Sequence, residues 1–268
     1  MSLPLRKGLM KLTKDGAIHL TILGSGTCVP SLSRSACSVF LKTNGQNILI
    51  DAGPGTMRRL LEAGISIFDI DFFFLSHFHP DHCAEMVPFL FANRYPDMGK
   101  RGKKLTLCGG PGFSSFFNGL NEIFNKWIEL PGMLETMELT PGRYAFKGFE
   151  LEAAAVNHRP ESLAFRVTSQ SKATVVYSGD TDFSENLIGL SKNADILICE
   201  SALPDGIKVA GHMTPGLAGK TATAAKVKHL VLTHFYPECD NVDIKAQCRK
   251  TYAGPLTLAE DLMTLTVG

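Results

Sequence analysis

The sequence has no long hydrophobic run and little net charge. No stretch of about 18 apolar residues occurs in its 268 residues, so we expect no membrane span. The formal net charge of +1 gives no general attraction to nucleic acid. Residues 1–8 lack the apolar stretch and the small-residue cleavage site of a secretory signal, and we therefore expect a cytoplasmic protein.

Paired cysteines are also missing. The seven cysteines are odd in number and scattered, and none forms a Cys-x-x-Cys pair, which predicts reduced and mostly buried thiols rather than disulfides. Cys83 directly follows His82 of the histidine motif described below. On a helix it would point away from the site that His82 faces, so we predict that Cys83 is not a metal ligand.

The composition is that of an ordered globular protein. Hydrophobic residues make up 44% and charged residues 20% of the chain, with a mean hydropathy of +0.06, which excludes wholesale disorder. The length allows one large α/β domain or two small ones. Because no linker rich in proline, glycine or serine separates two halves, we predict a single domain over residues 1–268.

The histidines are few, yet three of the eight lie within six residues, together with a carboxylate. The four residues of this histidine motif are His77, His79, Asp81 and His82. Residues 70–75 before them are apolar and aromatic, which predicts a buried strand. The first two ligands would lie on one side of the chain leaving this strand, and a helix starting at Pro80 would turn the last two to another angle. Such a cluster predicts a metal site, and its spacing predicts two ions.

Alternating and apolar segments predict strands linked by helices. In the first half we predict strands at 18–23, 36–42, 47–51 and 105–110 and helices at 56–64 and 113–127. From residue 137 the pattern restarts, with strands near 137–139, 149–156, 164–168 and 174–178. The order of elements thus recurs in two halves. We predict the α/β (α+β) class, as a four-layer αββα sandwich of two mixed, mainly antiparallel sheets.

Two short segments invite a phosphate-binding interpretation. Gly24-Ser25-Gly26-Thr27 follows a predicted strand, but it lacks both the Gly-x-Gly-x-x-Gly spacing and the Lys-Ser/Thr ending of a nucleotide loop. The basic run at residues 100–104 is more typical of a solvated turn than of a phosphate-binding patch. Neither segment therefore predicts a nucleotide site.

Further metal ligands are expected just past the ends of other strands, because a binuclear site needs more than four ligands. Three polar residues stand at predicted strand exits, namely His158, Asp180 and His234. Taken alone, each is as consistent with an ordinary structural histidine or turn aspartate as with a ligand. With the histidine motif they complete a candidate site of seven ligands.

This set of residues resembles that of the metallo-β-lactamase-fold hydrolases and, among them, the ribonuclease Z branch. The resemblance covers nearly the whole chain and includes segments 23–27, 51–56, 178–181, 211–214 and 232–235. It implies a homodimer with two metals in each subunit. It also implies that one metal is held by His77, His79 and His158, the other by Asp81, His82 and His234, and that Asp180 bridges both.

Two divalent ions roughly 3.5 to 4 Å apart can bridge a water, lower its pKa and stabilise the attacking and leaving oxygens of a phosphoryl displacement. We therefore predict a phosphodiesterase whose nucleophile is a metal-bridging hydroxide. Asp81 can orient this hydroxide as well as bind metal. His212 is the candidate general acid, because it resembles the histidine of the ribonuclease Z His-Ser/Thr-Thr motif, although Met213 departs from the usual small polar residue.

Three more residues have supporting assignments. Glu200 follows a hydrophobic strand, where it either orients His212 or is an ordinary strand-end carboxylate. Thr214 can donate to a substrate phosphate. Asp51 is expected to orient a metal-bound histidine rather than to bind metal itself.

One departure from the family concerns the substrate. The resemblance implies a long basic arm that clamps transfer RNA, which bacterial ribonuclease Z enzymes insert between the positions matching His158 and Asp180. Here these residues are only 22 positions apart, which leaves room for two strands and a turn at 169–172. We therefore favour a small phosphodiester over RNA.

Several alternatives stay open. Relatives of the same fold hydrolyse sulfate esters and lactones, the site residues also fit a transfer RNA 3′-processing endoribonuclease, and a nucleic-acid-binding module could use metal only structurally. Structural zinc sites are usually closed and four-coordinate, which argues against the last alternative. Zinc is the first expectation for the two metals, and manganese or iron would also suit these ligands.

Overall fold

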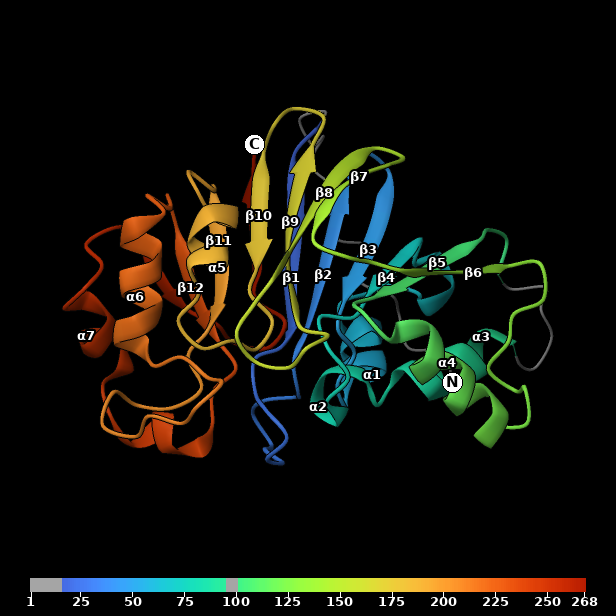
Figure 1. Cartoon of the computed structure of the whole chain (residues 1–268), viewed down its shortest axis with the longest axis horizontal. Helices are drawn as coiled ribbons and strands as arrows, with labels where there is room; N and C mark the ends of the chain where they lie inside the picture. The colour runs from blue at the N-terminus through green and yellow to red at the C-terminus, as the bar shows by residue number, and fades with distance from the viewer. Residues whose placement is uncertain (1–15, 95–100) are drawn as a thin grey trace, which may run out of the picture.

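The computed structural model describes residues 16–94 and 101–268 of the chain. These residues form two seven-stranded sheets that pack face to face (Figure 1). The first sheet has the strand order β14-β1-β2-β3-β4-β5-β6. Its strands are β1 (Ile18–Gly24), β2 (Ser38–Thr43), β3 (Gln46–Ile50), β4 (Phe72–Phe74), β5 (Leu105–Gly109), β6 (Leu134–Glu138) and β14 (Thr264–Val267).

The second sheet has the order β13-β12-β11-β10-β9-β8-β7. Its strands are β7 (Gly142–Phe146), β8 (Phe149–Ala155), β9 (Leu163–Ser169), β10 (Thr174–Tyr177), β11 (Ile196–Glu200), β12 (Leu230–Thr233) and β13 (Leu256–Leu258).

Each sheet of the described residues contains three antiparallel and three parallel pairings. The predicted αββα sandwich of two mixed sheets is confirmed, but the expectation that the sheets are mainly antiparallel is wrong. The reason is the helical connections: a crossover helix between neighbouring strands makes those strands parallel.

The two halves also divide at a different place from the predicted one. The strand expected near 137–139 is β6, which pairs parallel with β5 of the first sheet instead of opening the second. Near the other end of the chain, β14 returns to pair antiparallel with β1. Periodicity along the sequence reveals neither pairing, because both depend on the sheet edge that the chain reaches after a connection.

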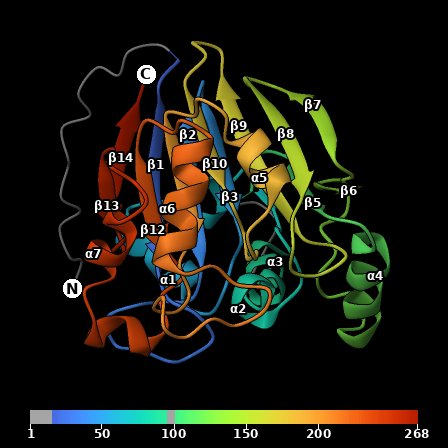
Figure 2. The same ribbon diagram turned by 60° about the vertical axis from the view of Figure 1, so that its left-hand side comes forward.

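Helices cover the outer faces of the sandwich. In Figure 1, α6 and α7 lie on the left of the sheets and α3 and α4 on the right; Figure 2 shows α5 and α6 in front of the second sheet. None of the helices in the described ranges has the length and hydrophobicity needed to cross a bilayer. The helices are α1 (Thr56–Glu62), η1 (Ile67–Asp69), α2 (Pro80–Cys83), α3 (Met86–Arg94), α4 (Phe113–Ile123), α5 (Glu185–Leu190), α6 (Pro215–Ala224), η3 (Pro237–Asn241) and α7 (Ile244–Arg249).

Strand β4 is buried on both faces and fixes the start of the histidine motif. Phe72 faces the second sheet, where the ring of Phe149 packs edge-on at a centroid distance of 5.0 Å. Phe73 faces the helix layer and packs on Phe89 of α3 at 5.4 Å. Successive side chains of a strand point to opposite faces, so one short aromatic strand joins both cores. The chain therefore enters the motif from a rigid position.

Candidate metal centre

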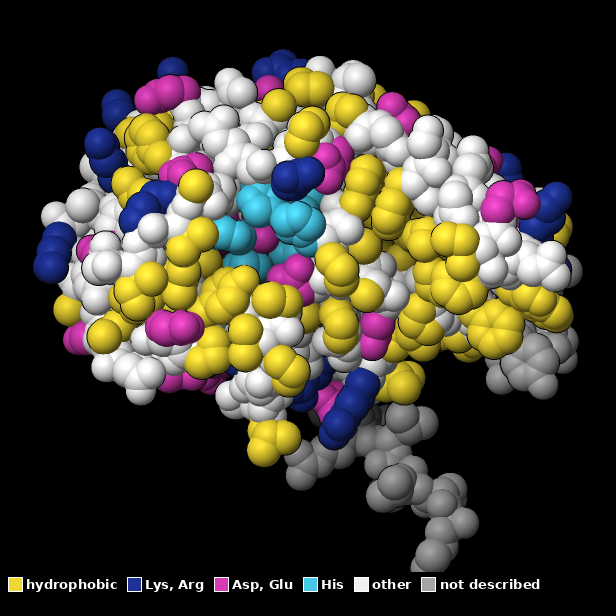
Figure 3. All heavy atoms as spheres, turned by 60° about the horizontal axis from the view of Figure 1, so that its bottom comes forward, with side chains coloured by type: hydrophobic (Ala, Val, Ile, Leu, Met, Phe, Trp, Pro, Cys, Tyr) yellow, Lys and Arg dark blue, Asp and Glu magenta, His cyan; other side chains and the backbone are white. Residues whose placement is uncertain are grey.

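The predicted site residues follow strands whose ends meet at one edge of the sandwich. Strands β10, β11 and β12 are parallel, and β8 runs the same way because both β8 and β10 pair antiparallel with β9. In the first sheet β3 and β4 are parallel. Figure 3 looks toward this edge and shows histidine side chains gathered in a hollow of the surface. The residues at the strand ends are Asp51 after β3, His77 after β4, His158 after β8, Asp180 after β10, Glu200 at the end of β11 and His234 after β12.

The histidine motif changes direction at Pro80, as predicted. His79 has an extended backbone (φ −65°, ψ 144°) and precedes α2, whose first residue is Pro80. Proline fits the first position of a helix because the N–H it lacks would have no partner there. The turn of α2 then buries His82 completely and leaves Asp81 8% exposed.

Asp180 lies between two groups of side chains, and one carboxylate oxygen faces each group. Its Oδ2 is 3.7 Å from Nε2 of His77 and 3.9 Å from Nε2 of His158. Its Oδ1 is 3.1 Å from Nε2 of His82 and 3.2 Å from Nε2 of His234. A carboxylate placed in this way can offer one oxygen to each of two ions.

The two remaining motif residues complete the groups. His79 belongs to the group around His158, with Nδ1 3.1 Å from its Nε2. Asp81 belongs to the other, with Oδ2 3.6 Å from Nε2 of His234 and 3.9 Å from Nε2 of His82. Ligands bound at about 2.0–2.2 Å to one tetrahedral ion lie roughly 3.5 Å apart, so these spacings suit metal binding. We call the first set the His158 group (His77, His79, His158) and the second the His82 group (Asp81, His82, His234).

Buried atoms without partners also fit the presence of metal. In the described residues no hydrogen-bond partner is found for Nε2 of His77, His82 and His234 or for Oδ1 of Asp180. A buried polar atom left unpaired costs roughly 1–3 kcal/mol, so four in one place need an explanation. Each of the three nitrogens lies within 4 Å of an oxygen of Asp180. Such a set of nitrogen and carboxylate donors suits a divalent ion such as zinc.

The electrostatics around His77, Asp81 and Asp180 favour the protonation states that metal ligands need. Burial, with the neighbouring His82, holds the pKa of His77 well below its usual value. Burial alone would raise the pKa of Asp81, but the adjacent imidazole of His234 and the charge of His82 outweigh it and lower that pKa to about 2. Burial would also raise the pKa of Asp180, but the charges of His234 and His82 outweigh it and hold that pKa well below its usual value. Neutral imidazoles and ionised carboxylates are the forms that bind metal.

Asp51 stands behind the His82 group. Its Oδ2 accepts hydrogen bonds from Nδ1 of His82 at 2.7 Å, from Oγ of Ser76 at 2.7 Å and from the hydroxyl of Tyr177 at 2.8 Å. Because Nδ1 of His82 carries the proton, the lone pair of Nε2 faces the centre. This is the arrangement that the predicted orienting role of Asp51 requires, and Tyr177 is a partner for which the sequence gives no signal.

His212 and Glu200 lie together beside the His158 group. Nδ1 of His212 is 3.1 Å from Oε1 of Glu200, whose Oε2 accepts from the backbone N–H of Met213 at 3.0 Å. Burial opposes a charge on His212, but the hydrogen bond and charge of Glu200 outweigh it and raise the pKa of His212. Burial raises the pKa of Glu200. Of the two assignments open for Glu200, these contacts favour the orienting one.

Comparison with known proteins places the chain in a family. The model of the β-lactamase superfamily domain matches residues 46–235, a range that contains all seven predicted ligands. The chain belongs to the β-lactamase superfamily. Ribonuclease Z of Streptomyces coelicolor is 27% identical over 93% of this chain and 97% of the relative, and that of Methanosarcina acetivorans is 27% identical over 93% and 98%.

Solved structures agree with this assignment. The metallo-β-lactamase-fold protein YhfI from Bacillus subtilis superposes with a TM-score of 0.81 at 22% identity, covering 93% of this chain and 99% of that one. The short form of human tRNase Z superposes with a TM-score of 0.74 at 25% identity, with the same coverage. The predicted metallo-β-lactamase fold of the ribonuclease Z-like branch is therefore confirmed.

Cys37 lies next to the centre, and nothing in the sequence indicates this position. Its Sγ and a ring nitrogen each of His82 and His234 lie within 4.8 Å of one another. Burial and the charge of Asp180 hold the pKa of this thiol well above its usual value, and Sγ donates to the carbonyl of Gly26 at 3.2 Å. Cys37 thus lies beside the centre as a neutral thiol. No motif surrounds it, so only the folded chain identifies it.

Other predicted residues have varied positions. Cys83 donates from Sγ to the carbonyl of Phe78 at 3.3 Å and lies outside both ligand groups, as expected. Thr214 is 5% exposed and precedes α6. In the glycine-rich loop, Ser25 donates from its backbone N–H and its hydroxyl to Oδ1 of Asp261 at 2.9 and 2.8 Å. These donors are therefore used within the chain and are not offered to a phosphate.

The basic run at 100–104 is not a solvated turn throughout, and that prediction is wrong for Arg101. This side chain is buried, and its guanidinium donates to the carbonyls of Ile67 and Phe68 and to Oδ1 of Asn93. A buried guanidinium satisfies several carbonyls at once, which explains its place. Lys103 forms an ion pair with Asp71 at 2.7 Å, whereas Lys100 lies outside the described residues.

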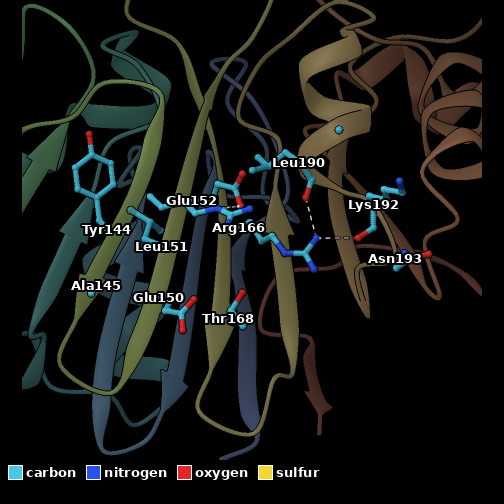
Figure 4. Close-up of a pocket in the computed structure, with 12 residues that line it drawn as sticks. Tyr144, Ala145, Glu150, Leu151, Glu152, Arg166, Thr168, Leu190, Lys192 and Asn193 are labelled. Carbon is cyan, nitrogen blue, oxygen red and sulfur yellow. Dashed lines mark hydrogen bonds and ion pairs between the residues drawn. The ribbon is translucent and has the colours of Figure 1, made fainter.

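A cavity of about 550 Å³ lies away from the centre, on the second sheet beside α5 (Figure 4). Arg166 donates from Nη1 to the carbonyls of Leu190 and Lys192, at the end of α5, at 2.8 and 3.0 Å. Arg143 pairs with Glu152 at 3.2 Å. These charged side chains bind one another or the backbone, and none of the predicted ligands lines this cavity.

Proposed function

We propose that the chain is a metal-dependent phosphodiesterase related to ribonuclease Z, with two divalent ions bound on either side of Asp180. One observation carries this proposal: the two carboxylate oxygens of Asp180 face two separate groups of histidine nitrogens. The similarity to ribonuclease Z over 93% of the chain supports hydrolysis of phosphate esters. The proposed ligands are His77, His79, His158, Asp81, His82, His234 and the shared Asp180.

The side chains divide the work of the reaction. When bound, the two ions supply a water of lowered pKa and neutralise charge on the phosphoryl oxygens. We assign to Asp81, which is more exposed than Asp180, the orientation of the attacking water as well as metal binding. His212, bonded through Nδ1 to Glu200, donates its Nε2 proton to the leaving oxygen. Thr214 is assigned to a phosphate oxygen of the substrate.

The substrate class that we propose is a small phosphodiester. Strands β9 and β10 follow each other within residues 163–177, so no arm extends from the segment between the two predicted ligands His158 and Asp180. Two cations of the loops at this edge are engaged: Lys208 pairs with Asp182, and Arg34 pairs with Asp240, at 2.7 Å each. Cations held by carboxylates attract a polyanion less strongly than free ones, which supports a substrate with few phosphates.

A transfer RNA 3′-processing endoribonuclease is the second candidate. The observation that favours it is the name of the relatives, ribonuclease Z, at nearly full coverage of both chains. Incubation of the purified protein with a transfer RNA precursor that carries a 3′ trailer would release the trailer if this candidate holds. Binding of that RNA without cleavage in the presence of Zn²⁺ or Mn²⁺ would instead indicate a non-catalytic binding module.

Hydrolysis of a simple diester tests the leading proposal. Protein loaded with zinc, manganese or iron is expected to hydrolyse bis(p-nitrophenyl) phosphate, and Asp81→Ala is expected to lose about 100-fold or more in turnover. A sulfate ester and a lactone, measured alongside, test the other ester classes of this fold, and faster turnover of either would reassign the substrate. Full diesterase activity in Asp81→Ala would contradict the proposal.

We also propose that the metal is zinc and that the protein is a cytoplasmic homodimer of single-domain subunits, the dimer being what the family resemblance implies. Metal analysis of protein purified from its own source tests the zinc. Light scattering during size-exclusion chromatography tests the dimer.

A further inference from the structure

We propose that Asp182 is a positioning residue that holds the peptide of Gly211 and thereby aims His212 at the leaving oxygen. This inference rests on the proposed function, because His212 is the general acid of that reaction. Asp182 lies two residues beyond the shared ligand Asp180, on the segment that leaves β10.

The carboxylate of Asp182 joins two segments that are distant in sequence. Its Oδ2 accepts from the backbone N–H of Gly211 at 3.2 Å and from Nζ of Lys208 at 2.7 Å. Its Oδ1 accepts from the N–H of Phe183 at 2.7 Å, which fixes the carboxylate on its own segment. The loop that carries His212 is therefore tied to the strand end that carries the shared metal ligand.

The peptide of Gly211 is held on both sides. Its N–H donates to Asp182, and its carbonyl accepts from Nδ1 of the ligand His158 at 3.0 Å. Its φ of +85° lies in the left-handed region, and a Cβ at this position would lie 2.9 Å from Nδ1 of His158. The chain thus approaches the ligand too closely for any side chain.

His212 follows this fixed peptide and is held from the other side by Glu200. Glu200 accepts from Nδ1 of His212 and from the N–H groups of Met213 and Thr181, but no bond from its side chain to residues 205–211 is found in the described structure. Residues 205–210, which lead into Gly211, are all exposed. Removal of the Asp182 carboxylate would therefore free this side of the loop, while Glu200 would still hold the imidazole nitrogen.

The ion pair with Lys208 suggests a simpler alternative, in which Asp182 only contributes a surface salt bridge. Side-chain exposures of 39% and 31% make this pair one of little energetic weight. The alternative predicts that Lys208→Ala and Asp182→Ala have equal effects. Our inference predicts that kcat falls when Asp182→Ala removes the acceptor for the N–H of Gly211, and not when Lys208→Ala removes the ion pair.

A series of methyl aryl phosphodiesters with leaving groups from p-nitrophenol to phenol separates these interpretations. A positioned acid matters most for the poorest leaving group, so Asp182→Ala is expected to lose about tenfold or more in kcat on the phenyl ester and less than about threefold on the p-nitrophenyl ester. Asp182→Asn keeps an oxygen acceptor for Gly211 and is expected to restore most of the rate. Lys208→Ala should leave the leaving-group dependence unchanged.

Asp195 provides a matched control, because its carboxylate accepts from the N–H of Thr174 and pairs with Lys228 at 2.7 Å, away from the metal centre. Asp195→Ala should leave the leaving-group dependence unchanged. Metal content should stay at the wild-type level in Asp182→Ala. An equal loss on all esters, or loss of metal from Asp182→Ala, would overturn the inference. If the wild-type protein hydrolyses none of the esters, the proposed function itself fails.

Discussion

The two ligand groups around Asp180 differ in what stands behind them. In the His82 group, the imidazole of His82 is fully buried and its Nδ1 is bonded to a carboxylate, that of Asp51. In the His158 group, Nδ1 of His158 is bonded to a neutral carbonyl, that of Gly211, and the side chain remains 7% exposed. A carboxylate behind an imidazole makes it a more basic ligand. We infer that the His82 group binds its ion more tightly.

The charge around the two imidazoles follows the same division. Burial alone would lower the pKa of His82, but Asp180 and Asp51 outweigh it and raise that pKa well above its usual value. Burial lowers the pKa of His158, with only Asp180 and the Gly211 carbonyl acting against it. The His82 group also contains the carboxylate of Asp81. Negative charge is thus concentrated on one side of the centre.

The largest loss of turnover is expected from removing Asp180, which lies between the two groups. Asp180→Ala takes one ligand from each group, and we expect turnover of bis(p-nitrophenyl) phosphate to fall by about 1,000-fold or more, since the activated water and the charge neutralisation are lost together. Metal analysis should show fewer than two ions per chain. Wild-type turnover and metal content in Asp180→Ala would show that the two groups do not share this ligand.

Stepwise chelation is the next test of the comparison. Chelator titration of the loaded protein should remove two ions in separate phases, the first from the more exposed His158 group. At a free metal concentration 100 times the dissociation constant, a bound ion stabilises the fold by about 2.7 kcal/mol, so each phase should lower the unfolding temperature by several degrees. A single phase in calorimetry and metal release would contradict a difference between the groups.

The sequence locates the proposed ligands better than it locates the residues that support them. His77 to His82, His158, Asp180 and His234 follow apolar strands, and the strand ends could be located because polar side chains interrupt a local pattern. The supports act across the fold: Asp51 meets Tyr177, and Asp182 meets Gly211, only after the sheets have packed. The places of β6 and β14 in the first sheet are hidden for the same reason, since strand order is not a local property.

A smaller effect is expected from neutralising the carboxylate behind His82. Asp51→Asn keeps the shape of the side chain but removes its charge, and we expect the metal affinity of the His82 group to fall about 10- to 100-fold. Competition with a metal-sensitive dye measures this affinity. The affinity of the weaker site, assigned to the His158 group, should change little. A loss confined to the weaker phase would mean that the two groups had been assigned in the wrong order.

The smallest effect, a change in the free energy of unfolding, is expected from removing one of two buried tyrosine hydroxyls. One of these hydroxyls bonds to a carboxylate and the other to a neutral carbonyl, as do the imidazoles of His82 and His158. Tyr177 donates to the carboxylate of Asp51 at 2.8 Å, whereas Tyr252 donates to the carbonyl of Val227 at 3.0 Å, away from the centre. Hydrogen bonds to charged groups contribute about 1.5–3 kcal/mol and neutral ones about 0.5–1.5 kcal/mol, so Tyr177→Phe should lower the free energy of unfolding more than Tyr252→Phe in urea denaturation. Only Tyr177→Phe should also weaken the tighter metal phase, because it removes a donor from the carboxylate that orients His82. Equal losses of stability with unchanged metal affinity would separate Asp51 from metal binding and leave it a purely structural acceptor.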